Sequence, residues 1–313
     1  MRIGVVVDSS CDLPPEFMEE HGVKIFPNSI RIGQDTLVDE RDPDATLAFF
    51  SSHIGDKSHD AETSPFSVDA IQKVFLERLV LDYDFVFCIT VWSKRSHVYE
   101  NATKASFAIL STYRKTRSAA GVTGPFSMRV IDSKTLFCGV GLVAAETVRM
   151  AQEGLQPNEI RANLDQLIPN VVGYFVPADL AYIRIRALSR GEKSVGLATY
   201  LIGTALDIKP VLGIYREDTK PVAKVRGYDG AVEKMLLHIA KSVKTANLLS
   251  KYVVVSYGGD LDEVRNMAGY AELERACQER ELTLMLSIMS ATAVVNVGAG
   301  GICAGYAGDL VPM

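Results

Sequence analysis

The chain has 313 residues, which is enough for two domains of ordinary size. Its composition, with 48% hydrophobic and 23% charged residues, is that of a globular protein and excludes a largely disordered chain. The net charge of -5 leaves no basic excess to neutralise phosphates, which argues against nucleic-acid binding.

The first half of the chain alternates apolar runs with helical patterns. Continuous apolar runs predict buried strands at Ile3–Val7, Phe85–Ile89 and Met128–Ile131. This alternation is typical of a doubly wound parallel sheet, and we assign residues 1–165 to an α/β domain of that kind. Shorter strands are expected at 24–26 and 29–32, and helices at 45–51, 68–79 (with Ser67 as N-cap), 99–110 and 142–151.

Three of the predicted strands end in polar residues. Asp8 follows the first strand, Thr90 the second and Asp132 the third. Because ligands of open α/β sheets bind beyond the carboxyl ends of the strands, we expect a site where these loops meet. Asp8 and Asp132 could form an acid/base pair there, although strand-end aspartates are more often loop caps.

The second half, residues 166–313, predicts an α+β domain with a mixed or antiparallel sheet. Two closely spaced strands around Tyr215–Lys220 indicate a hairpin. The uncharged stretch Leu282–Gly308 is long enough to span a bilayer, but its glycines and hydroxyls favour a strand, a glycine turn and a second strand. We expect no transmembrane segment, strands at 172–176, 210–215, 221–225, 252–257 and 282–289, and helices at 196–206, 229–245 and 260–280.

Cysteine and histidine spacing predicts neither a metal site nor a cofactor. The five cysteines form no C-x-x-C pair and lie among apolar neighbours, as in a reduced cytoplasmic protein. The five histidines show no metal-ligand spacing. The glycine-rich segment Gly298–Gly305 has too few residues after it to complete a dinucleotide-binding βαβ unit.

The stretch Ile89–Ala102 combines hydroxyls, cations and the only tryptophan between a strand and a helix. Hydroxyls and free helix amides suit an anionic group, and N-capping in an ordinary βα turn accounts for them equally well. His97 lacks the third, orienting group of a hydrolase triad. Neutral hydroxyls suit a carboxylate whose apolar remainder is buried, and the candidates are Thr63, Ser64, Ser93 and Ser96.

Six motifs follow one another in a characteristic order. They are Val5–Leu13, Thr63–Ser67, Ser93–Ala102, Val130–Ser133 with Gly139 and Gly141, Ile208–Leu212 with Lys224–Gly227, and Asn296–Gly300. In this order they resemble the DegV family over nearly the whole chain, including its Thr-Ser-Gln-Pro-Ser and Ser-Gly-Leu-Ser-Gly-Thr-Tyr-Gln-Asn-Ala segments.

The resemblance implies a non-catalytic binding protein for one long-chain fatty acid. Its acyl chain would lie in a buried tunnel between the two domains, and its carboxyl group would be presented to a separate fatty acid kinase subunit. Carried over by position, Thr63 and Ser93 would hydrogen-bond the carboxylate, with Ser64 and Ser96 close by.

Three segments of the chain depart from the family pattern. Asn296 replaces its usual His, Lys193 stands near its Arg, and His97-Val98 replace Gly-Thr. Loss of charge at Asn296 roughly halves the strength of a hydrogen bond to a carboxylate. His97, Lys94 or Lys193 could restore the positive charge.

Two alternatives remain open at this point. One is an enzyme on the same fold that uses Asp8 or Asp132 on a small anionic substrate. The other is a carrier for a ligand other than a fatty acid, which the change at Asn296 would permit.

Overall fold

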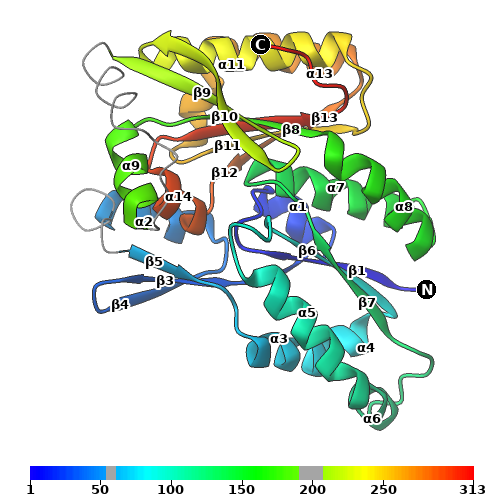
Figure 1. Cartoon of the computed structure of the whole chain (residues 1–313). Helices are drawn as coiled ribbons and strands as arrows, with labels where there is room; N and C mark the ends of the chain where they lie inside the picture. Colours follow the sequence, from blue (N-terminus) through cyan, green and yellow to red (C-terminus); the bar gives the residue numbers. More distant parts are fainter. Residues whose placement is uncertain (54–60, 190–206) are drawn as a thin grey trace.

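The computed structural model describes residues 1–53, 61–189 and 207–313 (Figure 1). Their strands form three sheets of four, six and three strands. In the view of Figure 1 the six-stranded sheet lies above the other two, and the three-stranded sheet lies to the left of the four-stranded sheet.

The four-stranded sheet is entirely parallel, as predicted. Its strands are ordered β2-β1-β6-β7, so the three strands with polar ends are neighbours. All six residues of β6 except the first are buried, which explains its continuous apolar run. The strands are β1 (Ile3–Asp8), β2 (Lys24–Phe26), β6 (Phe85–Thr90) and β7 (Ser127–Asp132).

Helices cover both faces of this sheet. The predicted helix after Ser67 is confirmed, and the Ser67 hydroxyl accepts a hydrogen bond from the amide of Ala70 at 3.2 Å. One helix begins at Cys138, ahead of the start predicted at residue 142. Its first turn contains Gly139 and Gly141, and glycine is a poor helix former, so the apolar pattern did not include that turn. The helices are α1 (Pro15–Glu20), α3 (Val68–Val74, continued by a π-helical turn, Phe75–Leu79, and α4, Val80–Asp82), α5 (Val98–Ala108), α6 (Tyr113–Ala119), α7 (Cys138–Gln152) and α8 (Pro157–Leu167).

The three-stranded sheet is antiparallel and was only partly predicted. The pattern indicated β3, whereas β4 and β5 are short and lack a clear apolar alternation. The sheet is ordered β4-β3-β5, with β3 at Asn28–Ile32, β4 at Asp35–Asp39, β5 at Ala61–Ser64, and α2 (Pro43–His53) following β4.

The six-stranded sheet is mixed, as predicted for the second half. Its order is β10-β9-β8-β13-β11-β12, and only β11 and β12 pair in parallel. The predicted hairpin is confirmed, and it turns at Arg216 and Glu217, which both have positive φ. The strands are β8 (Val171–Val176), β9 (Ile208–Tyr215), β10 (Asp218–Arg226), β11 (Tyr252–Tyr257), β12 (Thr283–Ile288) and β13 (Ile302–Ala307).

The prediction for residues 282–308 was wrong in one respect. Between the two expected strands lies a helix, α14 (Ala291–Val297), followed by the glycine turn. Its valines and threonine favour strands by intrinsic preference, but the Ser290 hydroxyl caps the helix by accepting from the amide of Ala293 at 3.0 Å. Within the described residues, no helix is long and apolar enough to cross a membrane.

The remaining helices differ from the predicted ones in detail. The helix expected at 260–280 is two helices, α12 and α13, separated at Gly269, whose φ of 89° suits a glycine. A helix not predicted, α9, follows β8, and the one predicted at 196–206 lies outside the described residues. Their bounds are α9 (Leu180–Ser189), α11 (Tyr228–Thr245), α12 (Leu261–Arg265) and α13 (Tyr270–Glu279).

Helix α7 lies between the two larger sheets (Figure 1). One apolar cluster includes Val7 of the parallel sheet, Val143 of α7 and Val254 of the mixed sheet, so both sheets share a core. The predicted domain boundary at residue 165 falls within α8, between the last parallel strand and β8. The division into two domains at that point stays a prediction.

Candidate functional site

Two aspartates hold the loop that follows β6. The carboxylate of Asp8 accepts a hydrogen bond from the amide of Val91 at 2.7 Å. Asp132 accepts from the amide of Ser93 at 3.1 Å and from its hydroxyl at 2.5 Å. The polar ends of β1, β6 and β7 therefore meet, as the sequence predicted, and both carboxylates act there as loop caps.

The other predicted residues of this loop have different surroundings. Ser96 accepts a hydrogen bond from the amide of Val98 at 3.3 Å, at the start of α5. The His97 side chain is 80% exposed and lies 3.2 Å from Glu100, on the outer side of the helix. Lys94 is also exposed and pairs with Glu217 at 2.8 Å. His97 is thus turned toward solvent, and Lys94 toward the β9–β10 turn.

Thr63 and Ser64 occupy the end of β5 and point in opposite directions. Successive residues of a strand face opposite sides of its sheet, so Thr63 shares a face with Ala61. Ala61 packs in an apolar cluster with Val295 of α14. Thr63 therefore lies on the side toward α14 and is half-buried, whereas Ser64 is exposed.

A side-chain hydrogen bond ties the segment after β5 to the start of α5. The side-chain amide of Asn101 donates to the carbonyl of Phe66 at 3.0 Å, and its backbone amide donates to the carbonyl of His97 at 2.9 Å. The motif that carries Thr63 and the loop that carries Ser93 therefore approach the same end of α5.

Asn296 lies in α14 and is half-buried. Its side-chain amide donates to the carbonyl of Thr292 at 2.8 Å, within its own helix. The predicted site residue Lys193 lies outside the described residues.

A buried arginine that was not among the candidates reaches the same region. Arg186 of α9 is only 4% exposed and donates to the carbonyl of Ala61, in the strand that carries Thr63, at 2.5 Å. In a sequence, a cluster of basic residues most often indicates a solvated surface. The alternation Arg184-Ile185-Arg186 within one helix gave no signal that Arg186 faces inward.

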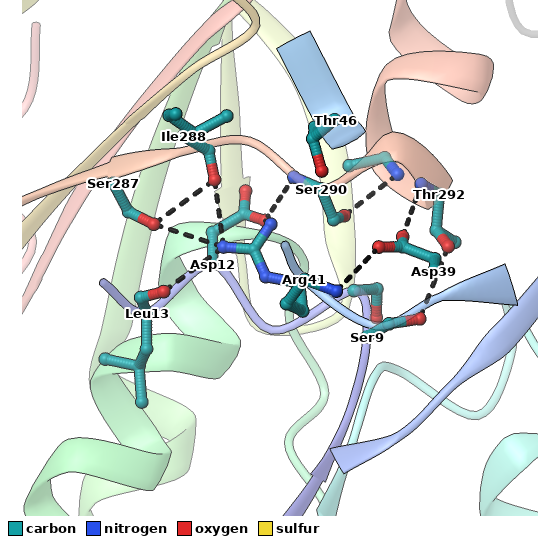
Figure 2. A network of polar contacts seen from close by, with 12 residues as sticks. Ser9, Asp12, Leu13, Asp39, Arg41, Thr46, Ser287, Ile288, Ser290 and Thr292 are labelled. Carbon is teal, nitrogen blue, oxygen red and sulfur yellow. Dashed lines mark hydrogen bonds and ion pairs between the residues drawn. The ribbon is translucent and has the colours of Figure 1, made fainter. Parts of the chain in front are cut away.

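A second buried arginine joins all three sheets (Figure 2). Arg41, which follows β4, lies 3.6 Å from Asp12 and donates to the carbonyls of Leu13 and Ile288 at 3.1 and 2.9 Å. Asp12 also accepts from the amide of Ser290, the N-cap of α14, at 3.0 Å. The start of α14 is thereby fixed against the loop that follows β1.

Burial dominates the charge state of this network. It raises the pKa of Asp12 from 3.8 to about 6, although Arg41 and the amide of Ser290 act in the opposite direction. Burial also raises the pKa of Asp8, against the hydrogen bonds from Ser10 and Val91. Desolvation therefore outweighs the hydrogen bonds for both carboxyls.

One cavity lies beside the predicted loops. It has a volume of about 110 Å³ and is lined by Lys134, Thr135, Ile214 and Glu217, among others. Pockets that hold small-molecule ligands usually measure about 300–1,000 Å³. This cavity is therefore too small for a long acyl chain. Among the described side chains, no group of three or more His, Cys, Asp or Glu is placed to hold a metal ion.

The class of this protein is defined by a parallel sheet and a mixed sheet that pack on one central helix, with hydroxyl-bearing loops at the carboxyl ends of the parallel strands. A family model described as "Uncharacterised protein, DegV family" matches residues 2–307. The chain belongs to the DegV family.

Three known proteins illustrate the relationship. A DegV domain-containing protein of Xanthomonas campestris is 48% identical over 309 residues, which cover 99% of this chain and 98% of the relative. A protein of Thermotoga maritima named fatty acid-binding protein is 24% identical over 306 residues, 96% of each chain. The crystal structure of a stearic acid-binding protein of Eubacterium ventriosum has the same fold, with a TM-score of 0.75, 23% identity and 98% of each chain covered.

Proposed function

We propose that this protein binds one long-chain fatty acid without transforming it. The carboxylate would lie between Thr63 and Ser93, and the acyl chain would extend into the apolar region between the two larger sheets. The observation that carries the proposal is the approach of the Thr63 segment and the Ser93 loop to the same end of α5. The ligands named for the Thermotoga and Eubacterium proteins support it.

The side chains suit a carboxylate in number and kind. Thr63 offers a hydroxyl on the side toward α14, where Asn296 offers an amide. The buried guanidinium group of Arg186, beside β5, supplies the positive charge that Asn296 lacks. A hydrogen bond from a charged donor is roughly twice as strong as one from a neutral donor.

The way the two aspartates are used supports binding without catalysis. Asp8 and Asp132 both accept hydrogen bonds from loop amides, so they order the loop rather than face an open site. An enzyme that uses them as acid and base is therefore less favoured. Presentation of the bound acid to a fatty acid kinase subunit is part of the proposal and needs a partner protein for its test.

The direct test is native mass spectrometry of the purified protein, followed by removal of lipid and titration with palmitic acid. We expect a bound mass in the range of a long-chain fatty acid, and one equivalent of palmitic acid to rebind. A protein that neither carries nor rebinds a fatty acid would contradict the proposal.

Ser93→Ala tests the assigned head-group position. It removes the hydroxyl bond to Asp132 that holds the loop beside the carboxylate, so we expect binding to weaken by about 1–3 kcal/mol. Ser111→Ala, which changes an exposed serine beyond the far end of α5, is the matched control and should bind like the wild type. Equal affinity of Ser93→Ala and wild type in the same titration would remove Ser93 from the site.

A further inference from the structure

The only tryptophan of the chain, Trp92, has a buried indole N–H with no acceptor among the described residues. The residue is 4% exposed. A buried donor without an acceptor costs about 1–3 kcal/mol, and native proteins rarely leave one unpaired. An acceptor other than the described residues is therefore expected beside the indole.

The backbone of Trp92 is held on both sides. Its amide donates to the carbonyl of Thr135 at 3.2 Å, and its carbonyl accepts from the amide of Arg95 at 2.8 Å. Lys94 Nζ lies 5.6 Å and Arg95 Cζ 5.3 Å from the centre of the indole ring. Lys94 is paired with Glu217. The guanidinium group of Arg95 favours an acceptor with negative charge beside the ring.

Trp92 differs from the neighbouring Ser93 in its hydrogen bonds. The amide and the hydroxyl of Ser93 both donate to Asp132. A hydroxyl has one proton, so Ser93 cannot donate to a ligand without leaving Asp132. The indole N–H of Trp92 has no such prior partner among the described residues.

We propose that Trp92 Nε1 donates a hydrogen bond to the carboxylate of the bound long-chain acid. The inference rests on the proposed function and adds a ligand-binding residue to it. Trp92 then supplies the donor that Ser93 gives to Asp132, and the capped loop keeps its conformation when the acid binds. It also makes the site selective for an acidic head group over an uncharged one.

A single tryptophan makes the indole directly observable by NMR. The ¹⁵N-labelled, delipidated protein should show one indole N–H signal, because the chain has one tryptophan. Addition of palmitic acid should move its proton downfield, as expected for a bond to a carboxylate, and hexadecanol should move it much less. An indole signal that does not change while palmitic acid binds would overturn the inference and leave the proposed function intact.

Substitution gives an independent measurement. Trp92→Phe keeps an aromatic ring and removes the donor, so affinity for palmitic acid should fall about tenfold to a hundredfold, the range for a hydrogen bond to a charged group. Affinity for hexadecanol should fall less. Phe107→Leu, which alters a side chain 69% exposed on α5, is the control and should leave both affinities unchanged.

A second replacement guards against misfolding of Trp92→Phe. Incorporation of 3-benzothienylalanine at position 92 keeps the size and shape of the indole and replaces its N–H by sulfur. The same selective loss of palmitic acid affinity is expected, and equal affinity of this variant and wild type would overturn the inference. Failure of the wild-type protein to bind any fatty acid would instead reject the proposed function, and the inference with it.

Discussion

Arg41 contacts two segments that lie far from it in the sequence, the loop after β1 and the end of β12. Its guanidinium group reaches Asp12, the carbonyls of Leu13 and Ile288, and the hydroxyl of Ser287. It is 5% exposed, so the charges it compensates lie in a medium of low polarity (Figure 2). Removal of one partner of such a pair leaves the other charge buried and uncompensated.

Arg41→Met should therefore lower the free energy of unfolding by about 3–5 kcal/mol. Urea denaturation followed by circular dichroism measures this change. Arg31→Ala removes an ion pair with Glu62 in which both side chains are more than half exposed, and it should cost at most about 1 kcal/mol. Equal losses for the two variants would show that burial does not determine the contribution of Arg41.

Asn296→His tests whether α14 lies at the head group. A protonated imidazole would make a charge-assisted bond, so palmitic acid should bind more tightly at pH 5.5 than it binds to the wild type, and this gain should shrink above the usual histidine pKa of about 6.5. Asn266→His, at an exposed position just beyond α12, is the control. An affinity unchanged at both pH values would remove Asn296 from the site.

At the scale of elements, Gly141 allows α7 to approach the loop after β1. A Cβ atom at this position would lie 2.9 Å from the backbone oxygen of Asp12, closer than real contacts allow. In most helices a glycine-to-alanine change is stabilising by up to about 1 kcal/mol. Here the steric conflict is with backbone, which cannot move aside easily.

Gly141→Ala should accordingly lower the thermal midpoint, with a loss of about 1–3 kcal/mol. Gly230→Ala in α11 is the comparison, because its added Cβ would meet only the Val225 side chain at 3.3 Å. Calorimetry measures the thermal midpoints of both variants. A rise in the midpoint for Gly141→Ala would mean that the loop after β1 yields.

The sequence predicted those elements whose burial gives a simple pattern. Strand β6 is buried on both faces, and the polar ends of β1, β6 and β7 meet because parallel neighbours end at one edge. Helix α14 was missed because its valines and threonine favour strands by intrinsic preference. The cap at Ser290 and packing on β5 stabilise the helix instead. No local pattern reports either contact in advance.

The geometry of the candidate site also depends on contacts that no local sequence pattern reports. Ser93 and Thr63 could be named from residue type and resemblance, but their relative placement depends on Asn101, whose contact with Phe66 spans 35 residues. Arg186 and Trp92 could not be named, because inward orientation of a cation and an unpaired indole are properties of the folded chain. His97 was a reasonable candidate by position, yet its side chain faces solvent.

At the scale of the whole molecule, Asp12 couples stability to pH. Burial raises its pKa from 3.8 to about 6, so between these values the folded chain binds a proton more tightly than the unfolded chain does. The resulting stabilisation is fully present below about pH 4 and is lost as the pH rises through about 6.

Asp12→Asn removes this titration. The stability of the wild type relative to Asp12→Asn should therefore decline as the pH rises from 4 to 7, whatever the absolute stability of the variant. Urea denaturation of both proteins across this range measures the difference. A difference that grows with pH would mean that the pair with Arg41 outweighs burial.

The position of α7 restricts how a ligand can exchange. Twelve of its fifteen residues are buried, and its apolar cluster includes side chains of both larger sheets. Each such side chain brought into water costs about 1.5–3 kcal/mol. Moving the two sheets apart would expose many of them at once, at a cost that approaches the free energy of unfolding. If the acyl chain lies between the sheets as proposed, it would therefore enter and leave lengthwise, past the loops at the edge of the sheets, while the centre of the molecule stays closed.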